Sequence, residues 1–346
     1  YLQPILEDNL LVPSKMKSTF IHGYYYNQYH YYVIQIVFVE SGNMPFIKNE
    51  GKVNENTILI DGELFGLRGN LSLYVIQGGN DSRALIDTGT RLNFRKLFKK
   101  LDEMNLLPIQ TLLLTHGHWD HVAATSKLQK KAGVTEIYAS VPAVEKNLSH
   151  PELLNDVFND IPESIDDAIP LRDGESISIG DLELTAHEFF GHTRDSMAFI
   201  DRKNENIFVG DAIIDQYDKE TFNPTFFPPD FNEKAQIATF AKLRRLSKNL
   251  DAISLCHFGT WTGNDFNKIL KKMEPFYHAT KNALIKWKAQ GLSLDQITEQ
   301  YRETFIPNSR IYTKENKLGL KMLIEWLLKG LYLAGLIETK NVLEID

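Results

Sequence analysis

The sequence predicts a layered α/β fold, and three features of the chain support this prediction. From residue 58 onward, short apolar segments punctuated by glycine alternate with helical patterns. Residues 111–115 (Thr-Leu-Leu-Leu-Thr) form a continuous apolar run, which is typical of a strand buried on both faces. Strand patterns return after residue 175, so two β-rich halves cover residues 58–140 and 175–260.

In the first half, strands and helices alternate along the chain. Phe94, Leu97 and Leu101 recur at the spacing of one helical face, and Gly133 stands where a helix would end. The expected elements, in order, are a hairpin (71–77 and 84–86), the turn 87–90, a helix (92–104), the strand 111–115, a helix (122–132) and a strand (136–140).

In the second half, a helical stretch over residues 142–159 is followed by strand patterns. Residues 181–187 alternate apolar and polar side chains, as a strand with one buried face does. Further strands are expected over 197–200, 207–209 and 252–256, the first two joined by the hairpin loop Lys203-Asn204-Glu205-Asn206.

The two ends of the chain differ from this central region. Residues 1–56 contain a tyrosine-rich segment that predicts one or two extra strands, with a substrate-contacting aromatic arm as the alternative. The tail is helical, and Ser293-Leu294-Asp295-Gln296 is a capping-box pattern that opens a helix. We interpret the tail as an appendage for packing or for homodimerisation, with a substrate cap as the alternative. The predicted domains are therefore 1–56, 57–262 and 263–346.

Composition and charge exclude several classes of protein. The chain has 346 residues, and its single cysteine, Cys256, excludes an intramolecular disulfide. A net charge of −7 disfavours non-specific binding to nucleic acid. Lys321, Glu325 and Lys329 recur every four residues within the apolar stretch 318–337, which indicates an amphipathic helix and disfavours a membrane span. The first residues show no secretory signal pattern, so we expect a cytoplasmic protein without membrane association.

The segment Thr115-His116-Gly117-His118-Trp119-Asp120-His121 is the strongest chemical signal in the sequence. It follows a predicted buried strand and precedes a predicted helix, so its side chains gather where the backbone turns. Imidazole nitrogen and carboxylate oxygen are ligands that suit borderline metals such as zinc. The segment therefore predicts a metal site.

Three further ligand types stand beside glycine at the ends of predicted strands: His192, Asp211 and His257. Because strand ends of one sheet layer can converge on a single edge, we expect five histidines and two aspartates to meet there. Seven ligands are enough for two metal ions, with Asp211 able to bridge them. Cys256 is interpreted as a small buried residue, and the remaining histidines as surface or core residues: His22, His30, His150, His187 and His278.

This set of motifs resembles the metallo-β-lactamase-fold superfamily, in its glyoxalase II and lactonase-like branches. The resemblance covers about residues 57–260 and includes Leu85-Ile86-Asp87-Thr88-Gly89. It implies a four-layer αββα sandwich with an N-terminal extension and a C-terminal helical appendage. By the family pattern, the first metal would be held by His116, His118 and His192, the second by Asp120, His121 and His257, with Asp211 as the bridge and Asp87 as the carboxylate that orients a ligand histidine.

Departures from the family pattern narrow the choice of branch. Arg194-Asp195-Ser196 stands where the family often has Pro-Gly-Ser, which affects a turn and leaves the ligand assignment in place. The antibiotic-degrading enzymes place cysteine or serine at the position of Asp211, so that activity is disfavoured. The flavodiiron oxygen reductases have glutamate at the position of His118, so membership of that branch is also disfavoured. Motifs of the RNA-processing branches are not found.

The function expected from these residues is hydrolysis of a small carboxylic ester, lactone or thioester by a metal-bound hydroxide. Asp120 would hydrogen-bond the nucleophile and return a proton as the catalytic acid–base group. Two divalent ions are expected, with zinc preferred and iron or manganese as alternatives. The rival functions are a phosphodiesterase or nuclease of the same fold, an iron-dependent sulfur dioxygenase, and a non-catalytic scaffold that keeps its metal site.

Substrate specificity is expected to come from aromatic residues near the ligands. The segment 222–229, rich in aromatic residues and proline, follows Asp211 closely. It is interpreted either as a rigid surface loop or as a pocket wall for an apolar acyl chain or ring. The candidate substrate-binding residues are Trp119, Tyr217, Phe226 and Phe227.

Overall fold

The computed structural model describes residues 20–27, 30–37, 46–146, 163–217, 220–313 and 316–338. The chain divides into two compact units, Tyr1–Met44 and Pro45–Asp346. In the first unit, the tyrosine-rich segment forms the antiparallel pair β1 (Phe20–Asn27) and β2 (His30–Val37), as its strand-forming residues predicted.

One mixed sheet of the second unit contains the strands of the first half of the chain. Its members β7 to β10 are parallel, whereas β4 to β7 are antiparallel. Among the described residues the order is β10 (Ile169–Leu171), β9 (Glu136–Ser140), β8 (Thr111–Leu113), β7 (Arg83–Ile86), β6 (Ser72–Gln77), β5 (Thr57–Asp61) and β4 (Gly51–Lys52).

A second sheet contains most strands of the second half. All of its neighbouring strands are antiparallel except β14 and β17, which run parallel. Among the described residues the order is β11 (Ser176–Ile179), β12 (Leu182–Glu188), β13 (Met197–Asp201), β14 (Asn206–Phe208), β17 (Ala252–Leu255), β18 (Gly259–Thr262) and β3 (Phe46–Ile47).

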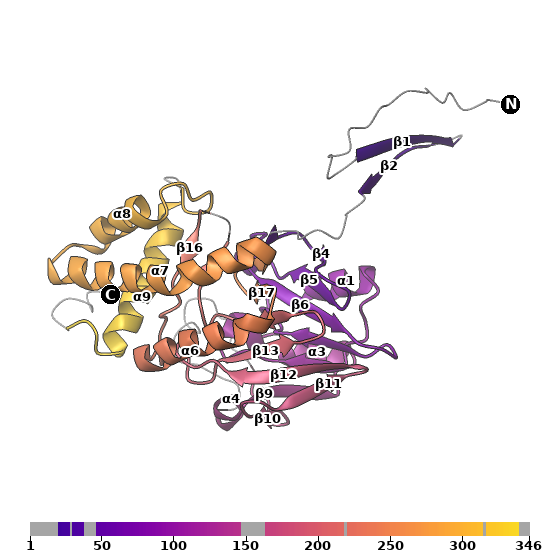
Figure 1. The fold of residues 1–346 in the computed structure, drawn as a ribbon, viewed down its shortest axis with the longest axis horizontal. Coiled ribbons are helices and arrows are strands. Elements are labelled where there is room, and N and C mark those ends of the chain that lie inside the picture. The colour runs from indigo at the N-terminus through magenta and orange to yellow at the C-terminus, as the bar shows by residue number, and fades with distance from the viewer. Residues whose placement is uncertain are drawn as a thin grey trace. The chain divides into compact units, whose positions relative to one another are not determined.

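Three apolar cores separate four layers in this unit. One core lies between the two sheets and joins residues such as Tyr74 and Phe199. A second joins the first sheet to α1 (Phe94–Glu103) and α3 (Thr125–Lys131). The third joins the other face of the second sheet to the remaining long helices (Figure 1). The order helix, sheet, sheet, helix is the predicted αββα sandwich, and burial on both faces explains the unbroken apolar runs 73–76 in β6 and 112–113 in β8.

The long helices that share the third core are α6 (Glu233–Leu246), α7 (Gly263–Ala289), α8 (Leu294–Phe305) and α9 (Lys317–Leu333). The capping box predicted at Ser293 is present: its hydroxyl accepts from the backbone N–H of Gln296, whose side chain accepts from the N–H of Ser293. None of the described helices combines the length and the apolar character that crossing a bilayer requires.

The helix expected over residues 122–132 is broken into α2 (Trp119–Val122) and α3. The backbone N–H of Ala124 donates to the carbonyl of Gly89, so it is turned away from a continuous helical ladder. Of the helical stretch expected over 142–159, α4 (Val141–Glu145) is present, and residues 147–159 lie outside the described part of the chain. The domain boundaries at 56/57 and 262/263 stay a prediction.

Candidate metal centre

The His116–His121 segment links β8 to α2 and is shaped by a buried carboxylate. Asp87, at the end of β7, accepts hydrogen bonds from the backbone N–H and the hydroxyl of Thr115, both at 2.8 Å. Three residues after Thr115, His118 has an extended backbone and directly precedes the first turn of α2. This arrangement turns the chain sharply after the strand and directs the motif's side chains to one place.

His116, His118, His192 and Asp211 form one group whose potential ligand atoms all lie within 4.8 Å of one another. Nε2 of His192 lies 3.0 Å from Nδ1 of His118 and 3.3 Å from Nε2 of His116. Nitrogen ligands about 2.0 Å from a tetrahedral zinc ion are themselves about 3.3 Å apart. The group therefore fits a divalent metal ion.

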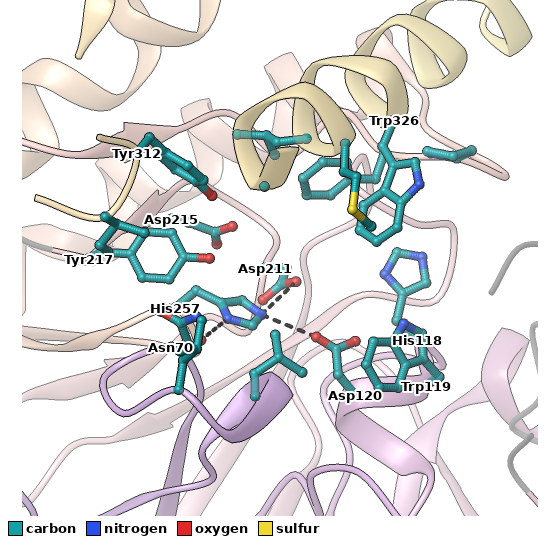
Figure 2. Close-up of a pocket in the computed structure, with 18 of the residues that line it drawn as sticks. Asn70, His118, Trp119, Asp120, Asp211, Asp215, Tyr217, His257, Tyr312 and Trp326 are labelled. Carbon is teal, nitrogen blue, oxygen red and sulfur yellow. Dashed lines mark hydrogen bonds and ion pairs between the residues drawn. The ribbon is translucent and has the colours of Figure 1, made fainter. Parts of the chain in front are cut away.

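Asp120, His121 and His257 form a second group with the same spread of ligand atoms. Oδ2 of Asp120 lies 3.4 Å from Nε2 of His257 and 3.6 Å from Nε2 of His121. In Figure 2, Asp120 and His257 face each other across the floor of a cavity. A mixed nitrogen and oxygen set of this kind also suits a divalent ion.

Asp211 lies between the two groups. Its Oδ2 is 3.3 Å from Nε2 of His121 and 3.5 Å from Nε2 of His257, which belong to the second group. The same oxygen is 3.8 Å from Nε2 of His192 and 3.9 Å from Nε2 of His116, which belong to the first. Two buried atoms here, Oδ1 of Asp211 and Nε2 of His121, have no hydrogen-bond partner among the described residues. Buried polar atoms are normally hydrogen-bonded, so this is expected of atoms that act as metal ligands.

Oxygen acceptors behind three of the histidines fix how their rings are oriented. Nδ1 of His192 donates to the carbonyl of Thr225 (2.5 Å), and Nδ1 of His257 donates to the carbonyl of Asn70. Nδ1 of His121 lies 2.8 Å from Oδ2 of Asp87. Because each Nδ1 carries its proton toward an acceptor, each Nε2 is left to face the centre.

The electrostatics of the two groups are dominated by opposite charges in a buried setting. Burial raises the pKa of Asp211, but the imidazolium charges of His121 and His257 outweigh burial and hold this pKa well below its usual value. Burial lowers the pKa of His121, but Asp211, Asp120 and Asp87 outweigh it and raise this pKa well above its usual value. In the metal-free protein, protons on His121 and His257 therefore balance the negative charge of the aspartates. A metal ion that binds to these histidines must displace the protons.

A cavity of about 340 Å³ opens above these groups. Figure 2 shows Asp215, Tyr217 and Tyr312 at one end and His118, Trp119 and Trp326 at the other. The polar lining residues are Asn70, His118, Asp120, Asp211, Asp215, Tyr217, His257, Tyr312 and Asn316, and the apolar ones include Leu64, Leu67, Phe227, Pro228, Pro229, Met322 and Trp326.

A sequence model of the metallo-β-lactamase superfamily matches residues 67–257, which is more than half of the chain. The chain belongs to the metallo-β-lactamase superfamily. Solved structures support the fold: a metallo-β-lactamase family protein from Thermus thermophilus is similar with a TM-score of 0.59 and 19% identity, covering 82% of this chain and 95% of that one. A β-lactamase domain protein from Burkholderia ambifaria is similar with a TM-score of 0.57 and 15% identity, covering 85% and 91%.

Known proteins that are similar in sequence to this chain include hydrolases. Hydroxyacylglutathione hydrolase GloC from Haemophilus influenzae is 29% identical over 191 residues, covering 52% of this chain and 81% of that protein. An atrochrysone carboxyl ACP thioesterase from Aspergillus fumigatus is 25% identical over 175 residues, covering 48% of this chain and only 36% of that protein. Together with the two ligand groups, family membership makes this chain a metallohydrolase.

The structure brings together all seven ligand candidates of this superfamily member, and it places Asp87 behind His121. Of the candidate substrate residues, Trp119, Tyr217 and Phe227 line the cavity. Phe226 does not: its side chain is fully buried and packs on the rings of Phe231 and Tyr277, because neighbouring residues of this loop face opposite sides.

Residues outside the predicted ligand set support the centre in ways the sequence did not show. Cys256 is buried as predicted, and its thiol donates to Oδ2 of Asp87. Asp195, part of the departure from the family pattern, accepts from the backbone N–H of Gly117 and so joins two ligand loops. His187 does not belong to either ligand group: its Nδ1 lies 3.1 Å from Oδ1 of Asp173.

Several residues of the cavity wall were not predicted from the sequence. Asp215 is buried there; burial and the negative charge of Asp211 raise its pKa well above the usual range. A lone aspartate four residues after Asp211 carried no motif. Met322 and Trp326 of α9 also line the wall, and their spacing of four on one helical face was the available signal.

Proposed function

We propose that this metallohydrolase holds two divalent ions and cleaves a carboxylic ester, lactone or thioester. The position of Oδ2 of Asp211 carries the proposal, because this oxygen lies between the imidazoles of His116 and His192 on one side and those of His121 and His257 on the other. A carboxylate in this position suits a bridge between two cations.

The residues divide between the two ions according to the groups they form. His116, His118 and His192 would hold one ion, and Asp120, His121 and His257 the other, with Asp211 shared. Zinc is the preferred metal because imidazole nitrogen and carboxylate oxygen are its common ligands. Iron and manganese are the alternatives that metal analysis would distinguish.

The bound ions would lower the pKa of water to about 7 and polarise a substrate carbonyl. The protein's own part is to position and to move protons. Asp120 lies on the cavity floor within reach of the space between the two groups, so its carboxylate would accept a proton from the attacking water and pass it to the leaving group. The apolar walls would limit the access of bulk water.

Two observations favour carbonyl substrates over phosphodiesters. Among the described residues that line the cavity there is no lysine or arginine to hold a phosphate, and the whole chain carries a net charge of −7. Two similar proteins, the hydroxyacylglutathione hydrolase and the atrochrysone carboxyl ACP thioesterase, support a thioester as the substrate. A sulfur dioxygenase and a metal-binding scaffold are the remaining rival functions.

Metal analysis and a substrate panel test the proposal. We expect about two zinc or similar ions per chain, and hydrolysis of at least one aryl ester, lactone or thioester. Asp211→Ala and His118→Ala should abolish this hydrolysis, whereas His187→Ala, a histidine outside the two groups, should retain it. One iron per chain with oxygen consumption, or cleavage of phosphodiesters alone, would contradict the proposal.

A further inference from the structure

The wall of the cavity opposite the metal ligands comes from the C-terminal part of the chain. Helix α9 contributes Met322, Leu323 and Trp326 to the lining, and the loop 227–229 contributes a phenylalanine and two prolines. We call these two segments the apolar wall. Leu64 and Leu67 extend the apolar surface from the first half of the chain.

The two segments of the apolar wall are packed tightly on each other. A Cβ atom on Gly330 of α9 would lie 2.1 Å from the carbonyl oxygen of Phe226, so only glycine allows this approach. The ring of Phe227 lies edge-on to the ring of Trp326, with centroids 6.3 Å apart. The same phenylalanine ring lies 5.8 Å from the ring of His192, so the wall reaches directly from a metal-ligand candidate to α9.

The floor of the cavity has the opposite character. Asp120, Asp211 and His257 lie there, and Figure 2 shows them between the tyrosine end and the tryptophan end. A substrate that places its carbonyl group at this floor has the apolar wall available for its acyl part, and polar groups at the tyrosine end of the cavity for its leaving group.

We propose that the apolar wall selects substrates whose acyl part is an uncharged, medium-length alkyl chain or a ring. This inference rests on the proposed function, because the carbonyl is assigned to the floor. Each methylene buried against Met322 and Trp326 improves binding by about fourfold. A carboxylate at the far end of the acyl part would be desolvated against apolar side chains, and it would meet no lysine or arginine among the described lining residues.

Acyl thioesters of N-acetylcysteamine and aryl esters of the same acids test the inference, because each leaving group is held constant and is neutral. Acetyl, butyryl, hexanoyl and octanoyl derivatives are compared with the succinyl derivative, which matches butyryl in carbon number but ends in a carboxylate. We expect kcat/KM to rise at least tenfold from acetyl to octanoyl, mostly through KM. The succinyl derivative should be at least tenfold poorer than the butyryl derivative.

Variants of the wall make the test specific. Met322→Trp fills the cavity and should remove the advantage of the octanoyl over the acetyl derivative. Trp326→Ala widens the cavity and should shift the preference toward longer chains. Leu318→Ala is the matched control, because Leu318 lies on the same helix with its side chain 72% exposed.

Binding to the metal-free protein separates this inference from the proposed function. We expect octanamide to bind at least tenfold more tightly than butanamide, as measured by calorimetry, and Met322→Trp to remove this difference. If no substrate is hydrolysed but this binding pattern holds, the proposed function is wrong and the wall's selectivity stands. Hydrolysis with equal kcat/KM for all chain lengths, or octanamide binding that Met322→Trp leaves unchanged, would overturn the inference.

Discussion

Asp87 supports the centre without facing the cavity. It has a left-handed backbone conformation (φ 60°), is fully buried, and accepts from Thr115, His121 and Cys256. A buried carboxylate is tolerated only when such donors surround it. The residue therefore couples the turn after β7 to the orientation of one ligand ring.

Asp87→Asn should weaken metal binding about 10-fold to 100-fold, because an amide holds the Nδ1 proton of His121 less strongly than a carboxylate does. The loss is measured by titration against a competing chelator. Cys256→Ser keeps a donor to Asp87 and serves as the control, which should bind metal as the wild type does. Equal affinities of the wild type and Asp87→Asn would show that Asp87 has no part in orienting the ligand.

At the residue scale, the sequence was informative where chemistry restricts the residue type. His116 and His118 were predicted because histidines at this spacing after a buried strand have few other uses. Phe226 and Phe227 could not be distinguished, because adjacent aromatic residues in a loop show no periodicity that separates the core side from the cavity side. Asp215 was missed because an isolated aspartate carries no pattern.

At the element scale, the contact between α9 and the loop after β16 (Phe222–Asn223) depends on one glycine. Gly330→Ala would raise the intrinsic helix propensity, yet its Cβ would overlap the carbonyl of Phe226. We expect a net loss of about 1–3 kcal/mol in the free energy of unfolding, measured by urea denaturation. Leu333→Ala, at an exposed position of α9, is the control, and a stabilised Gly330→Ala variant would contradict the close contact.

A second element contact carries a pH dependence. Glu63, before the short helix η1 (Leu64–Gly66), is paired with Lys96 and Lys100 of α1, each at 3.0 Å. Hydrogen bonds from Lys100 and Lys96 hold the pKa of Glu63 below its usual value. A carboxyl group whose pKa is lowered by folding stabilises the protein above its unfolded-state pKa, and this contribution is lost as the pH falls through the folded-state pKa.

Glu63→Gln should therefore be less stable than the wild type at pH 7, by up to about 1 kcal/mol because Lys96 is largely exposed. The difference should shrink toward zero as the pH falls below about 4. Melting temperatures of both proteins across this pH range give the measurement. Glu103→Gln, which removes an exposed pair with Lys99, should show little difference at any pH.

The order of elements was largely predictable, but their breaks and docking were not. The strand over 136–140 was placed residue for residue, since apolar periodicity is a local property. The break between α2 and α3 was missed because it depends on a hydrogen bond between Ala124 and Gly89, which lie 35 positions apart in the chain. The position of α9 depends likewise on a distant loop carbonyl.

At the scale of the whole catalytic unit, the ligand candidates come from both halves of the chain. His116 to His121 follow a strand of the first sheet, whereas His192, Asp211 and His257 follow strands of the second. The two ions proposed here, bound to all of these residues, would connect the two sheets. The strand and helix patterns predicted a layered α/β fold, and the family resemblance implied its four layers, whereas dimerisation through the tail stays a prediction.

Removing the metal should lower the thermal stability of the whole unit. A ligand present at about 100 times its dissociation constant adds about 2.7 kcal/mol to the free energy of unfolding. For a protein of this size we expect chelation to lower the melting temperature by roughly 4 °C for each ion removed, measured by calorimetry. Asp211→Asn, which lacks the shared carboxylate charge, should lose much less on chelation, and equal losses would argue against a connecting role for Asp211.

The apolar wall and the metal-ligand candidates come from different parts of the chain. The groups assigned to bond cleavage stand on loops at strand ends, whereas much of the surface that meets the rest of the substrate stands on α9, about 60 residues beyond the last ligand candidate. Substitutions at Met322 or Trp326 can therefore alter which compounds are accepted while the reactive machinery is inherited unchanged. Under the proposed selectivity, substitutions in the tail would change which substrates fit without changing the groups assigned to bond cleavage.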